Sequence, residues 1–330
     1  MQDKLTSRQV QAWGLCILSV PAAMALCGAG WLWVLVGAAA AALCGAALRR
    51  IQYKTGFTVT RGFFKAYGNC GGRIVAVAEL LWLLLAAAGA ASACRLAFDE
   101  RLGVFGAAVP LFLAALVCRA GKVGAARVGG VVALVLLILY SIFALGAVRQ
   151  IRWQWCVPQG TAGDGAMALC LCLAPVAVLF FAEREELPAR VWGYDMAGAV
   201  LPALPAFLTA ACLSPELARC EAQPLMTLSK SLSVLSVMQR FEVLLSVAQL
   251  LGLVMLLAAM VCAAQNVAWA LAPKTHKTNY SGALCLAAFA ASYAAQELPV
   301  WIWAAGAAIF WGIAPILTQF IVNIKNSKKI

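Results

Sequence analysis

The sequence contains few charged residues, and acidic residues are especially scarce. Only 12% of its 330 residues are charged, of which 13 are Asp or Glu, and it has a single histidine. A soluble domain carries about 25% charged and 45–50% apolar residues, whereas this chain is 64% hydrophobic and has a mean hydropathy of +0.89. A soluble enzyme, a nucleic-acid-binding protein and a disordered chain are therefore poor descriptions of it.

Motifs that carry out chemistry are also missing. There is no G-x-S-x-G sequence, P-loop, C-x-x-C pair or paired carboxylate spacing, and the one histidine, His276, has no cluster around it. Catalysis requires a nucleophile, a base and an oxyanion donor together, so we expect no enzyme activity, no cofactor and no metal site. Most of the 13 cysteines lie in apolar runs and are interpreted as small hydrophobic residues. Cys156 and Cys220 lie outside these runs, where a disulfide between them is conceivable.

Long apolar runs are what the sequence has in abundance. A membrane-spanning helix needs about 20 consecutive apolar residues, whereas a membrane barrel alternates apolar and polar residues. The continuous runs predict an all-α integral membrane protein, with residues 1–330 forming a single membrane domain of ten transmembrane helices. The ten runs are 10–27, 30–48, 74–94, 102–118, 128–148, 167–182, 197–213, 241–261, 280–296 and 298–322.

The distribution of basic residues predicts the orientation of these spans. If the N-terminus is cytoplasmic and the chain changes side at each run, 18 of the 25 Lys and Arg residues fall in cytoplasmic segments. Cytoplasmic loops carry such an excess of basic residues. We therefore expect a multi-pass protein with both termini in the cytoplasm. The net charge of +12 then reflects topology and attraction to anionic membrane lipid, with no nucleic-acid partner.

Two prolines predict breaks in the helices. Proline removes a backbone hydrogen bond and clashes with the preceding turn, and matching breaks in the two halves of a transporter often mark its ligand site. Pro21 lies in the first run and Pro175 in the sixth, which are the opening helices of two five-helix halves. Kinking prolines are also common in membrane helices that bind nothing. The ligand-binding candidates at these breaks are Ser19, Pro21, Ala22, Cys172, Ala174 and Pro175.

Glu79 is an ionisable residue within the third apolar run. Such a residue usually faces a water-filled cavity or a partner, because charge is costly inside a bilayer. Trp82, one turn further along, would then be its deeper neighbour on the same face. The alternative is that the helix begins late and Glu79 reaches the cytoplasmic surface beside Arg73.

Residues 223–238 lie outside the membrane in this topology and predict an amphipathic helix. Leu225, Leu228, Leu232, Leu235 and Met238 recur at spacings of three and four. Such a helix could close the outer end of the bundle or rest in the membrane interface. Arg240 and Glu242 follow it, at the entry of the eighth run, and are candidates for a structural or gating role; the alternative is that the Glu242 carboxylate contacts the amine of a ligand.

Several segments together resemble the spore germination permease family, the B subunits of nutrient germinant receptors in the amino acid–polyamine–organocation transporter superfamily. They are LTSRQVQAWGL at residues 5–15, Arg95, VPQG at 157–160 and LSKSLSVLSVMQRFEVLLSV at 228–247. The resemblance implies a LeuT-like transporter fold of two inverted five-helix repeats, 10–148 and 167–322. It also implies an amino acid or similar nutrient held by helices one, three, six and eight, with Gln249 the candidate on helix eight.

The same resemblance implies location and partners. Family members lie in the bacterial cell membrane, here the spore inner membrane, and assemble with a larger membrane subunit and an outer lipoprotein subunit. A nutrient sensor is therefore the favoured function. An autonomous amino acid transporter coupled to Na⁺ or H⁺ is the alternative, although acids other than Glu79 are scarce in the apolar runs. A structural subunit with a degenerate pocket is a third possibility.

Overall fold

The computed structural model describes residues 4–26, 30–102, 105–157, 160–187, 192–221, 224–231, 241–273 and 278–327. Every regular element within these ranges is a helix. Six helical stretches are long and apolar enough to cross a membrane, and three apolar helices of 10–17 residues accompany them. The prediction of an all-helical, multi-pass membrane protein is therefore confirmed.

The elements follow one another with short connections. In chain order they are α1 (Ser7–Leu26), α2 (Trp31–Thr55), α3 (Val59–Leu102), α4 (Phe105–Arg119), α5 (Gly121–Val148), η1 (Trp153–Trp155), α6 (Ala162–Leu173), η2 (Ala174–Phe180), η3 (Arg184–Glu186), α7 (Trp192–Leu213), α8 (Pro215–Cys220), α9 (Pro224–Ser231), α10 (Phe241–Leu271), α11 (Ser281–Ala295), α12 (Val300–Ala307), η5 (Ala308–Ile313) and α13 (Ala314–Ser327).

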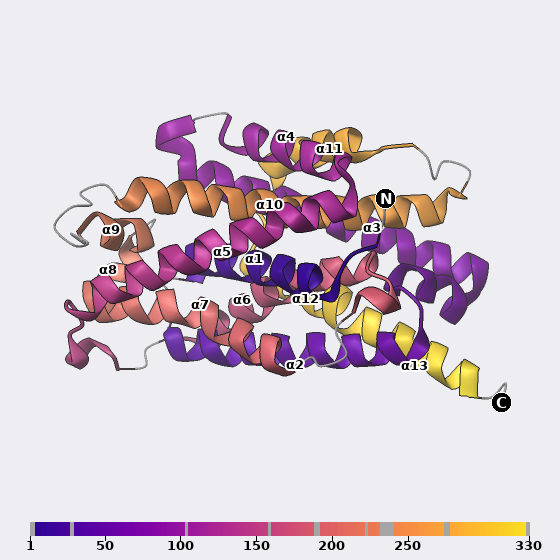
Figure 1. The fold of residues 1–330 in the computed structure, drawn as a ribbon, viewed down its shortest axis with the longest axis horizontal. Helices are drawn as coiled ribbons and strands as arrows, with labels where there is room; N and C mark the ends of the chain where they lie inside the picture. The colour runs from indigo at the N-terminus through magenta and orange to yellow at the C-terminus, as the bar shows by residue number, and fades with distance from the viewer. Residues whose placement is uncertain are drawn as a thin grey trace.

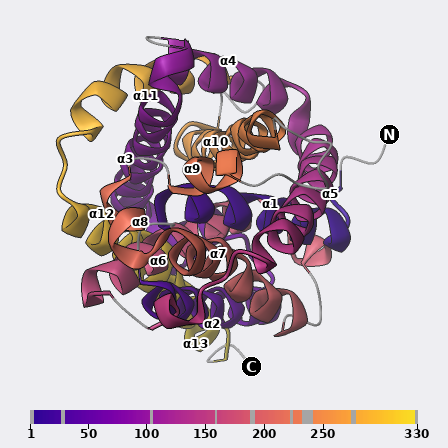
Figure 2. The same cartoon turned by 90° about the vertical axis from the view of Figure 1, so that its left-hand side faces the viewer.

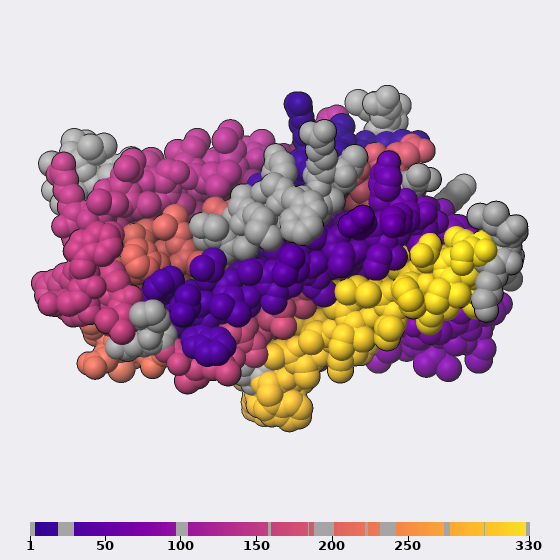
Figure 3. Space-filling model, turned by 90° about the horizontal axis from the view of Figure 1, so that it is seen from below, coloured from indigo at the N-terminus to yellow at the C-terminus, as the bar shows by residue number. Residues whose placement is uncertain are grey.

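The long helices run roughly along one axis of an elongated bundle (Figure 1). The start of α1, the end of α2 and the end of α13 lie toward the same end, which we call the terminal end. The short helices α8 and α9 lie at the other end, which we call the opposite end. Viewed from below, α2 and α13 run side by side across one face of the molecule (Figure 3).

The helices pack in two sets. In the first, α3, α4, α10 and α11 contact one another in every pairing. In the second, α2 packs against α6 and α7, and α1 packs against the same two helices. The end view separates the sets, with α3, α4, α10 and α11 on one side and α2, α6 and α7 on the other (Figure 2). Because α1 also contacts α5 and α10, it joins the two sets.

Local sequence accounts for several helix ends. Gly56 stops α2 by adopting φ 74°, and its N–H donates to the carbonyl of Gln52 at 2.9 Å, a conformation that glycine reaches without a Cβ penalty. Thr161 and Asp164 form a capping box that starts α6. Helix α3 has 44 residues, and one straight helix of that length would be longer than the thickness of a bilayer. Gly68, also at φ 74°, lies within it.

The structure contradicts two expectations from the sequence and covers a third only in part. The predicted break at Pro21 is not present, because α1 is helical from Ser7 to Leu26, as a helix can be when neighbouring groups satisfy the carbonyl that proline leaves free. Of the segment 223–238, predicted to form an amphipathic helix, residues 224–231 form the helix α9, and the rest lies outside the described residues. Cys156 and Cys220 are both free thiols, so the conceivable disulfide is absent.

Candidate functional site

Helix α6 changes its geometry at Pro175. The α-helix ends at Leu173, and the chain continues as the 3-10 helix η2 over Ala174–Phe180, with proline near its first position. Proline has no N–H to donate to the carbonyl four residues earlier, so the tighter 3-10 winding is a natural continuation. The predicted break in the sixth run is thus present as a change of helix type.

A cavity of about 70 Å³ lies beside this change of geometry, between α1, α2 and the α6–η2 segment. One water needs about 10–15 Å³ of such space, so the cavity has room for roughly five water-sized groups. Its walls are mainly apolar, and Gln11 and Arg49 are the long polar side chains among the described lining residues. Apolar walls with a few polar groups are typical of small-ligand sites.

Arg49 gives the cavity its charge. It lies in the last two turns of α2, is partly buried, and donates from Nε to the carbonyl oxygen of Gly45 at 3.3 Å. The described lining residues include no Asp or Glu. A guanidinium beside apolar walls matches a ligand that has a carboxylate and an apolar body.

The cavity brings together only some of the predicted ligand-binding residues. Cys172 and Pro175 line it, whereas Ala174 is buried and does not. Ser19, Pro21 and Ala22 belong to α1, but their side chains lie outside the described part of the structure. The remaining candidates, Glu79, Trp82 and Gln249, are not among the lining residues.

Arg49 and Gln11 were missed by the sequence-based prediction. From the sequence, Arg49 was used only as one of the basic residues assigned to cytoplasmic segments, and it was not considered as a ligand-binding residue. A usable signal was present, because Arg49 follows Ala38, Ala41, Ala42 and Gly45 on one stripe of small residues along α2. Such a stripe leaves room beside the helix that a larger residue would fill.

Glu79 and Gln249 are fully buried, each at 0% exposure, and none of their side-chain oxygen and nitrogen atoms has a hydrogen-bond partner in the described structure. Helix α3 begins at Val59, so Glu79 lies deep within it. The alternative that Glu79 reaches the surface beside Arg73 is therefore wrong. A buried polar group without a partner is costly, so these positions are candidates for contact with water, a proton or a solute.

Trp82 belongs to an aromatic cluster with residues of α12 and η5. Its ring stacks on Phe310 with centroids 5.5 Å apart, and it meets Trp311 edge-on at 5.5 Å. A Cβ added at Gly306 would come within 2.2 Å of the Trp82 ring, so only glycine fits there. The indole nitrogens of Trp82 and Trp311 are buried and have no described hydrogen-bond partner. The cluster fixes the face of α3 that also carries Glu79, one turn away.

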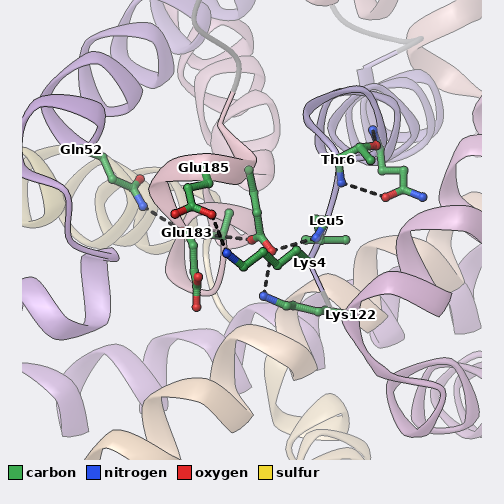
Figure 4. Close-up of polar contacts among 10 residues, drawn as sticks. Lys4, Leu5, Thr6, Gln52, Lys122, Glu183 and Glu185 are labelled. Carbon is green, nitrogen blue, oxygen red and sulfur yellow. Dashed lines mark hydrogen bonds and ion pairs between the residues drawn. The ribbon is translucent and has the colours of Figure 1, made fainter. Parts of the chain in front are cut away.

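A polar cluster at the terminal end ties the N-terminal segment to the segment after η2 (Figure 4). We call Lys4, Leu5, Lys122, Glu185 and Glu186 the terminal clasp. The Glu186 carboxylate is 1% exposed and accepts hydrogen bonds from the Leu5 N–H at 2.8 Å and from Lys122 Nζ at 2.9 Å. The Glu183 N–H donates to its other oxygen at 2.8 Å. One buried carboxylate therefore joins three separate segments.

Lys4 and Glu185 add an exposed pair to the terminal clasp. Their charged atoms are 2.5 Å apart, and both side chains are largely exposed. The hydrogen bond from Lys4 and its positive charge lower the pKa of Glu185, and the same pair raises the pKa of Lys4. Since water and salt screen such a pair, it adds little to stability.

Side chains from three other helices hold the end of η2. Gln52 Nε2 donates to the carbonyls of Leu179 and Ala182, at 3.2 and 3.1 Å. The Phe180 carbonyl accepts from Thr60 Oγ1 at 3.0 Å and from Asn266 Nδ2 at 2.6 Å. Polar contacts from α2, α3 and α10 thus fix the end of η2, next to Leu179, which lines the cavity.

At the opposite end, Asp164 connects three segments. Its Oδ2 accepts from the backbone N–H groups of Gly30 at 3.2 Å and Thr161 at 3.0 Å, and lies 3.9 Å from a guanidinium nitrogen of Arg219.

Helix α9, part of the segment predicted to be an outer helix, packs at this end. Leu225 and Leu228 of α9 are buried, and α9 packs on α7 and α10. Glu242 is the second residue of α10, and its carbonyl accepts from Ser246 Oγ at 2.6 Å. Arg240 lies outside the described residues. The gating role of these two residues therefore stays a prediction.

Comparisons with known proteins place the fold. No family model matches the chain, and no curated protein does. Among solved structures, one titled "Inward facing conformation of Mhp1" aligns with a TM-score of 0.52 and 12% sequence identity, over 91% of this chain and 75% of that one. The chain has a transporter-like membrane fold. At 12% identity the likeness concerns the fold alone, so ligand and physiological role must be argued from the residues.

Proposed function

We propose that this chain binds a small amino-acid-like nutrient and acts as the sensing membrane subunit of a spore germinant receptor. The observation that carries the binding proposal is the cavity at the α6–η2 junction, where apolar walls meet the Arg49 guanidinium. The receptor role depends on the resemblance of residues 5–15 and 228–247 to germinant-receptor B subunits. The transporter-like fold supports binding of a small solute in a membrane.

The finer architecture belongs to the same proposal. Ten spans would form inverted repeats over 10–148 and 167–322, with both termini in the cytoplasm of the spore inner membrane. The partners would be a larger membrane subunit and an outer lipoprotein subunit. In this orientation the terminal clasp faces the cytoplasm, and α9 faces the lipoprotein.

The cavity suggests how the ligand would be held. Its carboxylate would pair with Arg49, because a charge-assisted contact with guanidinium is strong and directional. Its apolar body would lie against Leu15, Leu18, Val176 and Leu179 of the walls. A ligand that fills the space between α1, α2 and η2 would shift the equilibrium between two arrangements of these helices. The partner subunits would respond to the arrangement that the ligand favours.

An autonomous ion-coupled amino acid transporter is the second candidate, and Glu79 favours it. This carboxyl group is fully buried and has no hydrogen-bond partner in the described structure. Intramembrane carboxyl groups commonly serve as proton or cation sites in transporters.

Replacing Arg49 with glutamine tests the cavity. A hydrogen bond to a charged group contributes about 1.5–3 kcal/mol, so Arg49→Gln should weaken binding of apolar L-amino acids by roughly 10- to 100-fold. The measurement is binding of labelled alanine, valine and leucine to the purified protein. Arg50→Gln is the matched control, because Arg50 is the next residue, is exposed and is not among the lining residues. Equal affinities in the two variants would remove the cavity as the ligand site.

Two measurements separate the sensor from the transporter. A sensor should co-purify with both partner subunits from spore membranes and should leave labelled amino acids outside proteoliposomes. A transporter should accumulate them when a Na⁺ or proton gradient is imposed, and Glu79→Gln should abolish that accumulation. Uptake by the protein alone, without co-purifying subunits, would overturn the sensor proposal.

A further inference from the structure

Two cysteine thiols meet away from the cavity, and a third lies on a neighbouring helix of the α3–α4–α10–α11 set. Cys118 lies at the end of α4, Cys262 in α10 and Cys285 near the start of α11. Cys262 Sγ is 3.3 Å from Cys118 Sγ, and Cys285 is within electrostatic range of both. No candidate site described above uses them.

The Cys118 and Cys262 sulfurs lie within a short movement of bonding distance. Sulfur atoms in a disulfide are about 2.05 Å apart, so the two sulfurs must approach by a little more than 1 Å. Cys118 Sγ also contacts the carbonyl oxygen of Ala258, one turn before Cys262, at 3.3 Å, which holds the thiol against α10. A metal ion is the less suitable occupant, because the described residues contain no group of three or more Cys, His, Asp or Glu placed to bind one.

We infer that Cys118 and Cys262 form a reversible disulfide that staples α4 to α10 when the membrane meets a peroxide. Cys262 is partly exposed and Cys118 is 7% exposed, so a small neutral oxidant reaches Cys262 first. Cytosolic thiol pools keep such pairs reduced in unstressed cells. The disulfide therefore forms only under oxidising conditions, and a thiol reductant restores the two thiols.

The chemistry balances with one hydrogen peroxide per disulfide. The Cys262 sulfur attacks the peroxide, a sulfur–oxygen bond forms, the oxygen–oxygen bond breaks, and the thiol proton leaves with the released oxygen as water. The Cys118 sulfur then attacks the resulting sulfenic acid, and the sulfur–oxygen bond breaks as a second water departs with the Cys118 proton. Two thiols lose two electrons, and the peroxide gains them.

The staple would act within one helix set. Both cysteines belong to helices of the α3–α4–α10–α11 set, whereas the cavity is lined by α1, α2 and α6–η2. Oxidation should therefore raise thermal stability, and it adds no bond to the helices that line the cavity. The bond joins residues 144 apart in sequence, and cross-links that close long loops restrict the unfolded chain most.

The test treats the purified, membrane-reconstituted protein with hydrogen peroxide, blocks the remaining thiols with N-ethylmaleimide and maps linked peptides by mass spectrometry. The Cys118–Cys262 peptide should form in the wild type and in Cys285→Ser, and be absent from Cys118→Ser and Cys262→Ser. The melting temperature of the wild type should rise by about 5 °C and fall back after reduction.

Two outcomes would overturn the inference. One is oxidation of Cys262 to sulfinic acid with no linked peptide in the wild type, which would show that the sulfurs cannot approach. The other is a link that requires Cys285 and is lost in Cys285→Ser. The first outcome is measured on the wild-type protein alone, so the inference can be tested even if a cysteine variant folds poorly.

Discussion

Replacing Glu186 with alanine should unfold the terminal end of the protein at a markedly lower temperature. The change leaves the Lys122 ammonium, which is 29% exposed, without its ion pair, and leaves the Leu5 and Glu183 N–H groups without their acceptor. Breaking a fully buried ion pair costs about 3–5 kcal/mol, and the partial exposure of Lys122 reduces this to about 2–3 kcal/mol. Thermal unfolding of the detergent-solubilised protein measures the effect.

The neighbouring carboxylate provides the control. Glu185 pairs with Lys4, and their side chains are 70% and 62% exposed, so Glu185→Ala should leave the unfolding temperature unchanged. The variants differ by one position in the same segment and remove the same charge. If both lowered stability equally, net charge at this end would be the cause, and the buried contacts of Glu186 would not be.

A second large effect is expected from Gly37→Ala at the contact between α2 and α6. A Cβ at Gly37 would lie 2.4 Å from the carbonyl oxygen of Gly165 and 2.8 Å from the Cβ of Ala168. Backbone atoms cannot move aside as a flexible side chain can, so the two helices must separate. Overpacking of this kind costs about 1–3 kcal/mol. Since α2 and α6 form two walls of the cavity, binding of labelled apolar amino acids should weaken as well.

Gly282→Ala is the matched control for this substitution. Gly282 is exposed on α11, and an added Cβ would meet no atom within 4 Å. Alanine favours a helix over glycine by about 1 kcal/mol, so this variant should be as stable as the wild type or slightly more stable. Gly37→Ala with the stability of Gly282→Ala would contradict the close α2–α6 contact.

The features that the sequence predicted correctly depend on neighbours along the chain. Continuous apolar runs predict membrane-spanning helices, because each residue in a bilayer must satisfy its own backbone groups locally. A break at Pro175 was predicted from the hydrogen bond that proline cannot donate, and the structure shows it as a change of helix type. The spacing of Leu225 and Leu228 predicted a helix with one buried face, and α9 buries both.

Pro21 shows where such local reasoning ends. The same residue type that changes α6 leaves α1 helical throughout, because the outcome depends on which groups from other helices surround the freed carbonyl. Glu79 shows the same limit, since the sequence allowed both a buried and a surface position. Only the packing of α3 against its neighbours decided for the buried one.

The sequence by itself determined that this chain is a bundle of apolar helices in a membrane, because hydropathy and backbone hydrogen bonding act over a few residues. The tertiary structure alone decided that Arg49 borders a cavity, that Glu186 meets Leu5 from 181 residues away, and that Cys118 meets Cys262. These contacts join helices distant in sequence, and their geometry depends on how side chains of the whole bundle fill space together.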